Sequence, residues 1–144
     1  MNRFIMKDMK KILVPIDGSK KSFEALDRAV ILAGFTNGEI TCLNVIPHVE
    51  DGGPRTRKYD EIIESQSQSI LNKAEKFVDK KNVKFRKKIL RGSPGIETLK
   101  VAKTGKYDHI VMSTTGAGSA KGDMIGSVSN FILQKSKIPV YLIK

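Results

Sequence analysis

Short apolar runs alternate with helix-like segments along the whole chain, and this alternation restricts the fold more than any other feature. The apolar runs occupy residues 12–16, 40–46, 83–90, 110–112 and 139–143. Apolar residues recur at helical spacing in the segments 19–34, 59–81, 93–102 and 127–135. Strands that alternate with helices form a parallel sheet with helices on both faces and right-handed crossovers. The sequence therefore predicts an α/β fold with a five-stranded parallel sheet.

The size of the chain agrees with one such domain. Its 144 residues, 40% of them apolar, are enough to bury a core. No linker interrupts the alternation, so we expect residues 1–144 to form a single domain. In the segment 83–90 apolar and charged residues alternate, which favours a strand near an edge of the sheet.

Residues near the expected ends of several helices and strands indicate where those elements begin or end. Ser19 follows the first apolar run as an N-cap, and Gly34 lies near the expected end of the helix that it opens. Ser93 and Pro94 are an N-cap and a first-turn proline for the third helix. The segment 47–57 has few apolar residues and contains Gly-Gly-Pro, which predicts a loop.

Charge and composition narrow the classes of partner. The net charge of +11 suggests nucleic acid, but the lysines and arginines form only short clusters and no aromatic residues interleave with them. No run approaches the ~20 apolar residues of a membrane span, and no secretory signal is visible. We therefore expect a cytoplasmic protein with no membrane partner and no nucleic acid.

Cys42 is interpreted as a core residue, and His48 and His109 as structural.

The glycine-rich segment 113–129, STTGAGSAKGDMIGSVS, carries the strongest functional signal. It lies between a predicted strand and a predicted helix, where backbone N–H groups can point outward. A helix start combines unpaired donors with a favourable dipole and so attracts phosphate. The turn Asp17-Gly18-Ser19 also follows a strand, and open parallel sheets bind ligands beyond the carboxyl ends of their strands. Both loops therefore predict a nucleotide site.

Known phosphate-binding patterns do not fit this segment. No stretch supplies the G-x-x-x-x-G-K-[ST] of a P-loop. The stretch from Gly116 to Gly122 differs from the dinucleotide fingerprint by one inserted residue, and the strand that follows ends without the acid that would bind a ribose. A phosphoacceptor receiver domain needs clustered acids after its first strand, where this chain has only Asp17.

The chain resembles the universal stress proteins, in their nucleotide-binding branch, over essentially its whole length. The resemblance rests on Lys11-Ile-Leu-Val-Pro-Ile-Asp-Gly-Ser19, Gly92-Ser-Pro94, Tyr107-Asp-His-Ile-Val-Met112, Gly126-Ser127-Val128-Ser129 and Ile138-Pro-Val140. The ATP motif of that family is G-x2-G-x9-G-[S/T]. This chain reads S-x2-G-x9-G-S, from Ser113 through Gly116 to Gly126 and Ser127.

The resemblance implies a fold and an assembly. The fold would be that of the adenine-nucleotide alpha-hydrolase-like proteins, with strand order 3-2-1-4-5. The last strand, Val140 to Ile143, would pair with its copy in a homodimer. A short apolar edge at a sheet border is otherwise an association hazard.

The resemblance also implies roles for individual residues. Pro15, Ile16 and Asp17 would line the adenosine pocket, with Asp17 near the ribose or near phosphates bound to Mg²⁺ or Mn²⁺. Ile40 and Met112 would sandwich the adenine. The residues that would hold ribose and phosphates are Ser113, Gly116, Gly126, Ser127, Val128 and Ser129. From the residues alone, Asp17 could instead form an Asx turn, and Ser127 could cap the last helix.

The resemblance implies that the function is adenine-nucleotide binding, of ATP or AMP, by a dimeric regulatory protein of the stress response. Two departures keep AMP or weak binding open: Ser113 replaces a glycine of the motif, and Asp123 brings a carboxylate near the phosphates, with Lys121 beside it. The chain shows no evident catalytic set, so at most slow ATP hydrolysis is expected. A stress scaffold that binds no nucleotide is the alternative.

Overall fold

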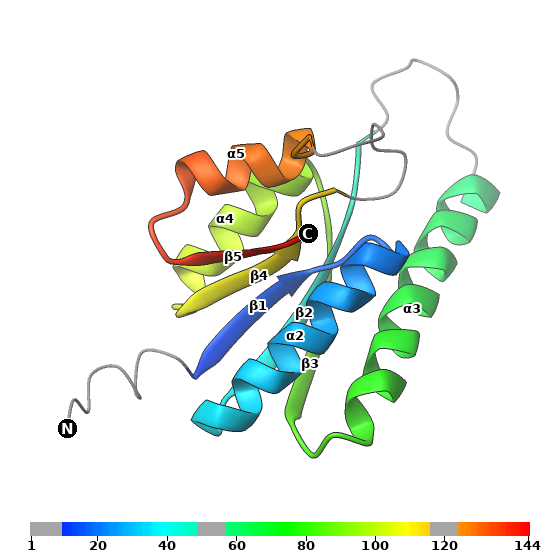
Figure 1. Cartoon of the computed structure of the whole chain (residues 1–144). Coiled ribbons are helices and arrows are strands. Elements are labelled where there is room, and N and C mark those ends of the chain that lie inside the picture. The colour runs from blue at the N-terminus through cyan, green and yellow to red at the C-terminus, as the bar shows by residue number, and fades with distance from the viewer. Residues whose placement is uncertain (1–9, 49–56, 116–123) are drawn as a thin grey trace.

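The computed structural model of the protein describes residues 10–48, 57–115 and 124–144. Strands and helices alternate through these residues, as the sequence predicts (Figure 1). The elements are β1 (Lys11–Pro15), α2 (Lys20–Thr36), β2 (Glu39–Ile46), α3 (Arg57–Asp79), β3 (Lys84–Arg91), α4 (Pro94–Thr104), β4 (His109–Ser113), α5 (Ser127–Lys135) and β5 (Val140–Ile143).

All five strands form one parallel sheet in the order β3-β2-β1-β4-β5, which confirms the predicted fold class and strand order. β2 and β3 pair in unbroken register from Glu39 opposite Lys84 to Ile46 opposite Arg91. The chain runs outward from β1 to β3 and then crosses back to β4 on the other side of β1. The order therefore reverses between β1 and β4, the place where open α/β sheets bind ligands.

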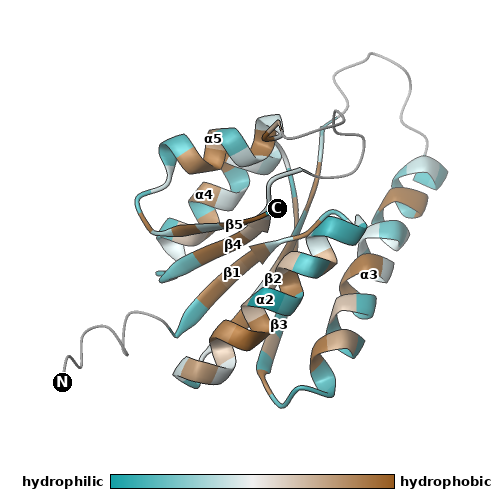
Figure 2. Ribbon diagram, viewed as in Figure 1, coloured by the Kyte–Doolittle hydropathy of each residue, from teal (hydrophilic) through white to brown (hydrophobic). Residues whose placement is uncertain are grey.

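Two apolar layers enclose the sheet. Alternate residues of β1 point to opposite faces, so that Ile12 and Val14 join one buried cluster and Leu13 joins the other. The first cluster lies under α2 and α3, and the second lies under α4 and α5. Figure 2 shows the hydrophobic residues concentrated in the central strands of the sheet. Strands buried on both faces explain the continuous apolar runs of the sequence.

The helix ends follow the local chemistry, with two differences from the predictions. The Ser19 hydroxyl accepts a hydrogen bond from the Ser22 amide at 3.1 Å, as an N-cap should. α2 continues past Gly34 to Thr36, and Asn37 is its C-cap. The φ of Asn37 is 54°, the left-handed conformation that glycine usually adopts at a helix end. Ser93 precedes Pro94 at the start of α4, but its side chain makes no capping hydrogen bond.

Within the described segments, none of the helices has both the length and the apolar character that crossing a bilayer requires. The predicted edge strand, β3, lies at one border of the sheet, and β5 lies at the other. The loops from both faces of the sheet therefore meet at the carboxyl ends of β1, β2 and β4.

Candidate functional site

A cavity of about 720 Å³ lies at these carboxyl ends, with α3 on one side and the start of α5 on the other. Its volume is in the range of small-molecule sites. Four groups of residues form most of the lining: Pro15, Ile16 and Asp17 at the end of β1; residues 43–47 at the end of β2; Ile63, Gln66, Ser67 and Ile70 of α3; and Met112, Ser113, Thr115 and residues 124–129 at the end of β4 and beyond it. The remaining lining residues are Ser22, Pro94 and Thr98.

Most of the predicted site residues meet in this cavity. Those on its lining are Pro15, Ile16, Asp17, Met112, Ser113, Gly126, Ser127, Val128 and Ser129. They come from three separate parts of the chain, which the parallel sheet brings to one edge. Gly116, and the loop residues Lys121 and Asp123, lie outside the described residues.

Ile40 is the exception. It lies near the amino end of β2, opposite Ile12 and Phe85, and is fully buried in the core beneath α2 and α3. It does not line the cavity, because ligands of a parallel sheet sit beyond the carboxyl ends of the strands. The β2 residues that do reach the cavity are 43–46, at the other end of the strand.

The turn after β1 is held by its own side chains. One carboxylate oxygen of Asp17 accepts a hydrogen bond from the Ser19 amide at 2.9 Å, which is the Asx turn that the sequence left open. Gly18 has a φ of +87°, and a Cβ there would come within 3.0 Å of Ile70. The tight turn therefore lets α3 pack closely while Asp17 remains exposed at the cavity.

The start of α5 forms the opposite wall. Gly126 occupies the N-cap, and its amide donates to the Thr114 carbonyl at 2.7 Å. The first amides of a helix have no acceptor within the helix, and no described residue outside it accepts from those of Ser127 and Val128. No acidic side chain lies in the first turn of α5. The helix dipole therefore favours an anion at this wall.

Gly126 adopts φ −63° and ψ 161°, an extended conformation open to any residue. A Cβ on it would meet the Thr114 carbonyl oxygen at 3.4 Å, an ordinary contact. The backbone therefore does not require glycine at this position. Gly126 lines the cavity, so a side chain added there would take up space beside the first turn of α5.

Two serine hydroxyls fix the path from β4 to α5. Ser129 donates to the Ser113 carbonyl at 2.8 Å, and Ser113 donates to the Thr115 carbonyl at 2.6 Å. Both side chains are buried. They hold the start of α5 against the end of β4, whereas Ser127 is exposed toward the cavity.

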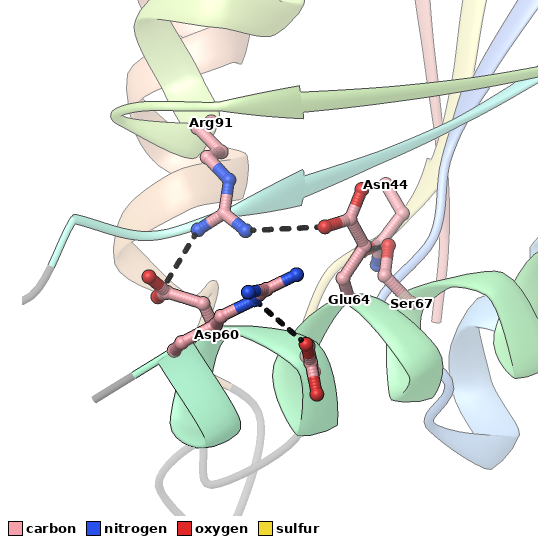
Figure 3. A network of polar contacts seen from close by, with 7 residues as sticks. Asn44, Asp60, Glu64, Ser67 and Arg91 are labelled. Atoms are coloured by element: carbon pink, nitrogen blue, oxygen red, sulfur yellow. Dashed lines mark hydrogen bonds and ion pairs between the residues drawn. The ribbon is translucent and has the colours of Figure 1, made fainter. Parts of the chain in front are cut away.

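Sequence reasoning missed a buried polar pair on the opposite side of the cavity. The Asn44 amide nitrogen donates to the Ile16 carbonyl at 2.8 Å, and the Ser67 hydroxyl donates to the Asn44 oxygen at 2.5 Å. These bonds join the ends of β1 and β2 to α3. Figure 3 shows the side chains of Asn44 and Ser67 from close by. The signal was available, because Asn44 is the one amide side chain in the mostly apolar run 40–46.

Arg91 adds a weaker tie at the end of β3. Its guanidinium nitrogens lie 3.8 Å from Asp60 and 3.7 Å from Glu64, both on the first turns of α3 (Figure 3). All three side chains are partly exposed, so the ion pairs contribute little to stability. They nevertheless place α3 beside the strand ends that line the cavity.

The cavity wall is mostly uncharged. Within the described segments, Asp17 is the one charged side chain on the lining. The described residues contain no group of three His, Cys, Asp or Glu side chains placed to hold a metal ion. Asp17 alone could offer a carboxylate to Mg²⁺, so phosphate oxygens and water would have to complete the coordination shell.

Comparison with known proteins gives one consistent result. The family model described as "Universal stress protein family" matches residues 9–144. Universal stress protein MJ0531 of Methanocaldococcus jannaschii is 31% identical over 141 residues, which cover 94% of this chain and 82% of that protein.

Solved structures show the same fold. The universal stress protein UspA from Lactobacillus plantarum superposes with a TM-score of 0.80 at 23% identity, over 94% of this chain and 98% of that one. A universal stress protein in complex with cAMP gives a TM-score of 0.75 at 20% identity, over 94% and 97%. The universal stress protein from Archaeoglobus fulgidus in complex with dAMP gives 0.73 at 22% identity, over 94% and 98%.

Proposed function

The chain belongs to the universal stress protein family, and on that basis we propose that its cavity binds an adenine nucleotide and that the protein acts in the stress response through the occupancy of this site. Two proteins of the same fold have been solved with adenine nucleotides, cAMP in one and dAMP in the other. One observation in this chain carries the proposal. In the described part of the chain, apolar side chains and the first amides of α5, which have no acceptor within the helix, line the same cavity.

The cavity suits the three parts of a nucleotide. The base lies in the apolar chamber among Ile16, Met112 and the end of β2, where burying its faces removes apolar surface from water. The ribose lies near Asp17, whose carboxylate can accept hydrogen bonds from sugar hydroxyls. The phosphate lies at the first turn of α5, where Ser127 adds a hydroxyl to the backbone amides. Gly116, in the loop before α5, is proposed as a further phosphate contact.

The charges at the cavity wall determine whether a nucleotide needs a metal ion in order to bind. A single phosphate matches the amides of one helix start without any cation. A triphosphate carries more charge, which a Mg²⁺ or Mn²⁺ ion between the phosphates and Asp17 would offset. We therefore propose that AMP binds without metal and that ATP binds together with a divalent ion.

Calorimetric titration tests the proposal. Purified protein is titrated with AMP, with cAMP, and with ATP in the presence and absence of Mg²⁺, with GMP as the matched purine control. We expect saturable binding of AMP and a clear gain in ATP affinity on adding Mg²⁺. Mass spectrometry of small molecules released from denatured protein identifies any nucleotide that has already been bound. No binding of any adenine nucleotide to ligand-free protein would favour the scaffold alternative.

A phosphate-release assay separates binding from slow turnover. The proposed function is regulatory, so we expect no ATP hydrolysis beyond a slow background. Turnover that is lost in Asp17→Asn, while AMP affinity is kept, would instead indicate a weak ATPase. Each of these outcomes is distinct from a failure to bind.

We further propose that two copies of the chain assemble through β5. This strand forms one border of the sheet and has a half-exposed tyrosine, Tyr141, on it. An unpaired strand edge presents a row of amides and carbonyls that a second copy can complete. A two-fold arrangement would satisfy both edges at once.

A further inference from the structure

The opposite border of the sheet, β3, bears positive charge on both of its faces. On the face covered by α3, the charges are matched. Lys87 lies 3.1 Å from Glu75, and Arg91 lies near Asp60 and Glu64. Phe85 and Ile89 of the same face pack against the apolar cluster beneath α2 and α3. This face of β3 is therefore neutralised and covered.

The other face of β3 carries Lys84, Arg86 and Lys88, which we call the cationic row. All three side chains are exposed. Among the described residues, none of the three takes part in an ion pair, and α4 packs on β2 rather than over them. Their neighbours in register on β2 are Glu39, Thr41 and Leu43, so only Lys84 has an acid beside it. Among the described residues, Arg86 and Lys88 therefore have no acid opposite them on β2, and the row keeps an excess of positive charge.

Within the described residues, the backbone of β3 is also unpaired along its outer side. The Gly92 amide donates to the Ile46 carbonyl at 3.0 Å, and the register with β2 runs without a bulge. Because successive residues of a strand point their amides to opposite sides, those of Phe85, Lys87 and Ile89 point away from β2. In the described part of the chain no other strand lies beyond β3. An extended segment could therefore pair with this edge.

From these observations we infer that the outer edge of β3 binds an acidic, extended segment of a partner protein, which adds to the sheet as a sixth strand. Its backbone pairs with the outward amides and carbonyls of β3, a common mode of peptide recognition. Acidic residues at alternate positions of the segment lie beside the cationic row, where opposite charges across a strand pair stabilise it.

The same charges exclude other occupants. Two β3 strands cannot pair, because like charges would stand opposite each other along the row. Charged edges of this kind also reject ordinary apolar strands. Single-stranded nucleic acid prefers aromatic platforms beside its cations, whereas the aromatic residue of β3, Phe85, faces the core. The acidic strand is the occupant that satisfies both charge and backbone.

Fluorescence polarisation with a labelled peptide, Glu-Val-Glu-Thr-Glu-Val-Glu, tests this inference. The whole protein is titrated into the peptide at low salt, and the cationic peptide Lys-Val-Lys-Thr-Lys-Val-Lys is the charge control. We expect saturable binding of the acidic peptide and no binding of the cationic one. Added salt should weaken the binding of the acidic peptide. Two further peptides carry N-methyl groups either on the glutamates or on the residues between them. One of the two must lose binding, because only one set of amides faces β3.

The matched variants reverse three charges each. Lys84→Glu, Arg86→Glu and Lys88→Glu together should weaken peptide binding by at least about tenfold. Lys76→Glu, Lys135→Glu and Lys137→Glu change the net charge equally at exposed positions elsewhere and should leave binding within about twofold. Circular dichroism confirms that both variants fold. Equal loss in both variants, or equal binding of both N-methylated peptides, would overturn edge pairing. Tighter binding of an oligoadenylate through the same row would replace the proposed partner.

Discussion

Asn44 shows how a single buried residue can organise the cavity. It is 8% exposed and uses both ends of its side chain, donating to the carbonyl of Ile16 and accepting from the hydroxyl of Ser67. A buried polar group without a partner is costly, so these three groups depend on one another. They fix the relative positions of β1, β2 and α3 at the point where the base of a nucleotide would lie.

Asn44→Leu should therefore lower the free energy of unfolding by about 1–3 kcal/mol, because the Ile16 carbonyl and the Ser67 hydroxyl would lose their buried partner. Urea denaturation of both proteins measures the change. Ser67→Ala provides the control, made alone and together with Asn44→Leu. We expect the combined loss to be smaller than the sum of the two single losses. Strictly additive losses would show that the two side chains act independently.

The buried thiol of Cys42 should make the stability of the protein depend on pH. The side chain is fully buried in β2, and this burial raises the pKa of the thiol well above its ordinary value of about 8.5. In the unfolded chain the thiol ionises near that ordinary value, while in the folded protein it keeps its proton. The free energy of unfolding should therefore fall as the pH rises above about 8.5. Comparing wild type and Cys42→Ala between pH 7 and pH 10 isolates this contribution, and parallel curves would contradict it.

At the scale of elements, the sequence predicted most boundaries because the local signals agree with the packing. α5 begins at Ser127 and ends at Lys135, as its helical spacing indicated. α2 extends two residues past Gly34, since Asn37 can adopt the left-handed cap conformation as well. The edge position of β3 was visible in its alternation of charged and apolar residues.

The candidate site was predicted only in part, for physical reasons. Asp17, Met112 and Ser127 lie at strand ends or open a helix, so the rule for parallel sheets predicts their position on the cavity lining. The same rule would have rejected Ile40 and favoured Val45, since only the second lies at the carboxyl end of β2. Asn44 and Ser67 meet through tertiary packing of α3, which no local spacing encodes.

We predict that a larger residue in place of Gly126, at the start of α5, weakens nucleotide binding. Gly126→Val should leave the fold intact, since the backbone is extended there and a Cβ meets only ordinary contacts. Its branched side chain would occupy space in the cavity beside the first turn of α5. AMP affinity should fall roughly 10- to 100-fold, the value of one or two hydrogen bonds to phosphate. Gly126→Ala, measured beside it by calorimetry, should show a smaller loss. Wild-type affinity in Gly126→Val would mean that phosphate does not approach here.

For the whole molecule, the two sheet borders are proposed to play different roles. β5 is short and apolar and suits pairing with its own copy, whereas β3 is long and cationic and repels its own copy. The cavity lies between these borders, at the reversal of strand order next to β1. The proposed assembly and the proposed ligand binding would therefore use separate parts of one sheet.

The proposed assembly predicts a particle of about twice the 16.0 kDa of one chain in light scattering at micromolar concentration. Tyr141→Glu should shift it toward the monomer, because two-fold pairing of β5 would bring two carboxylates together. Ile62→Glu changes an equally exposed apolar residue on α3, away from β5, and should leave the assembly unchanged. A wild-type monomer at this concentration would contradict pairing through β5.

The most direct test of the central claim is an NMR titration of ¹⁵N-labelled protein, freed of any bound ligand, with AMP. Nucleotide binding in the cavity should shift the amides of Asp17, Val45, Ser127 and Val128 together, with one common dissociation constant. Those residues are far apart in the sequence and meet only around the cavity. Amides at the far end of the sheet, such as that of Glu39, should stay in place. No shifts at millimolar AMP, or shifts that leave Ser127 and Asp17 unmoved, would contradict nucleotide binding at this site.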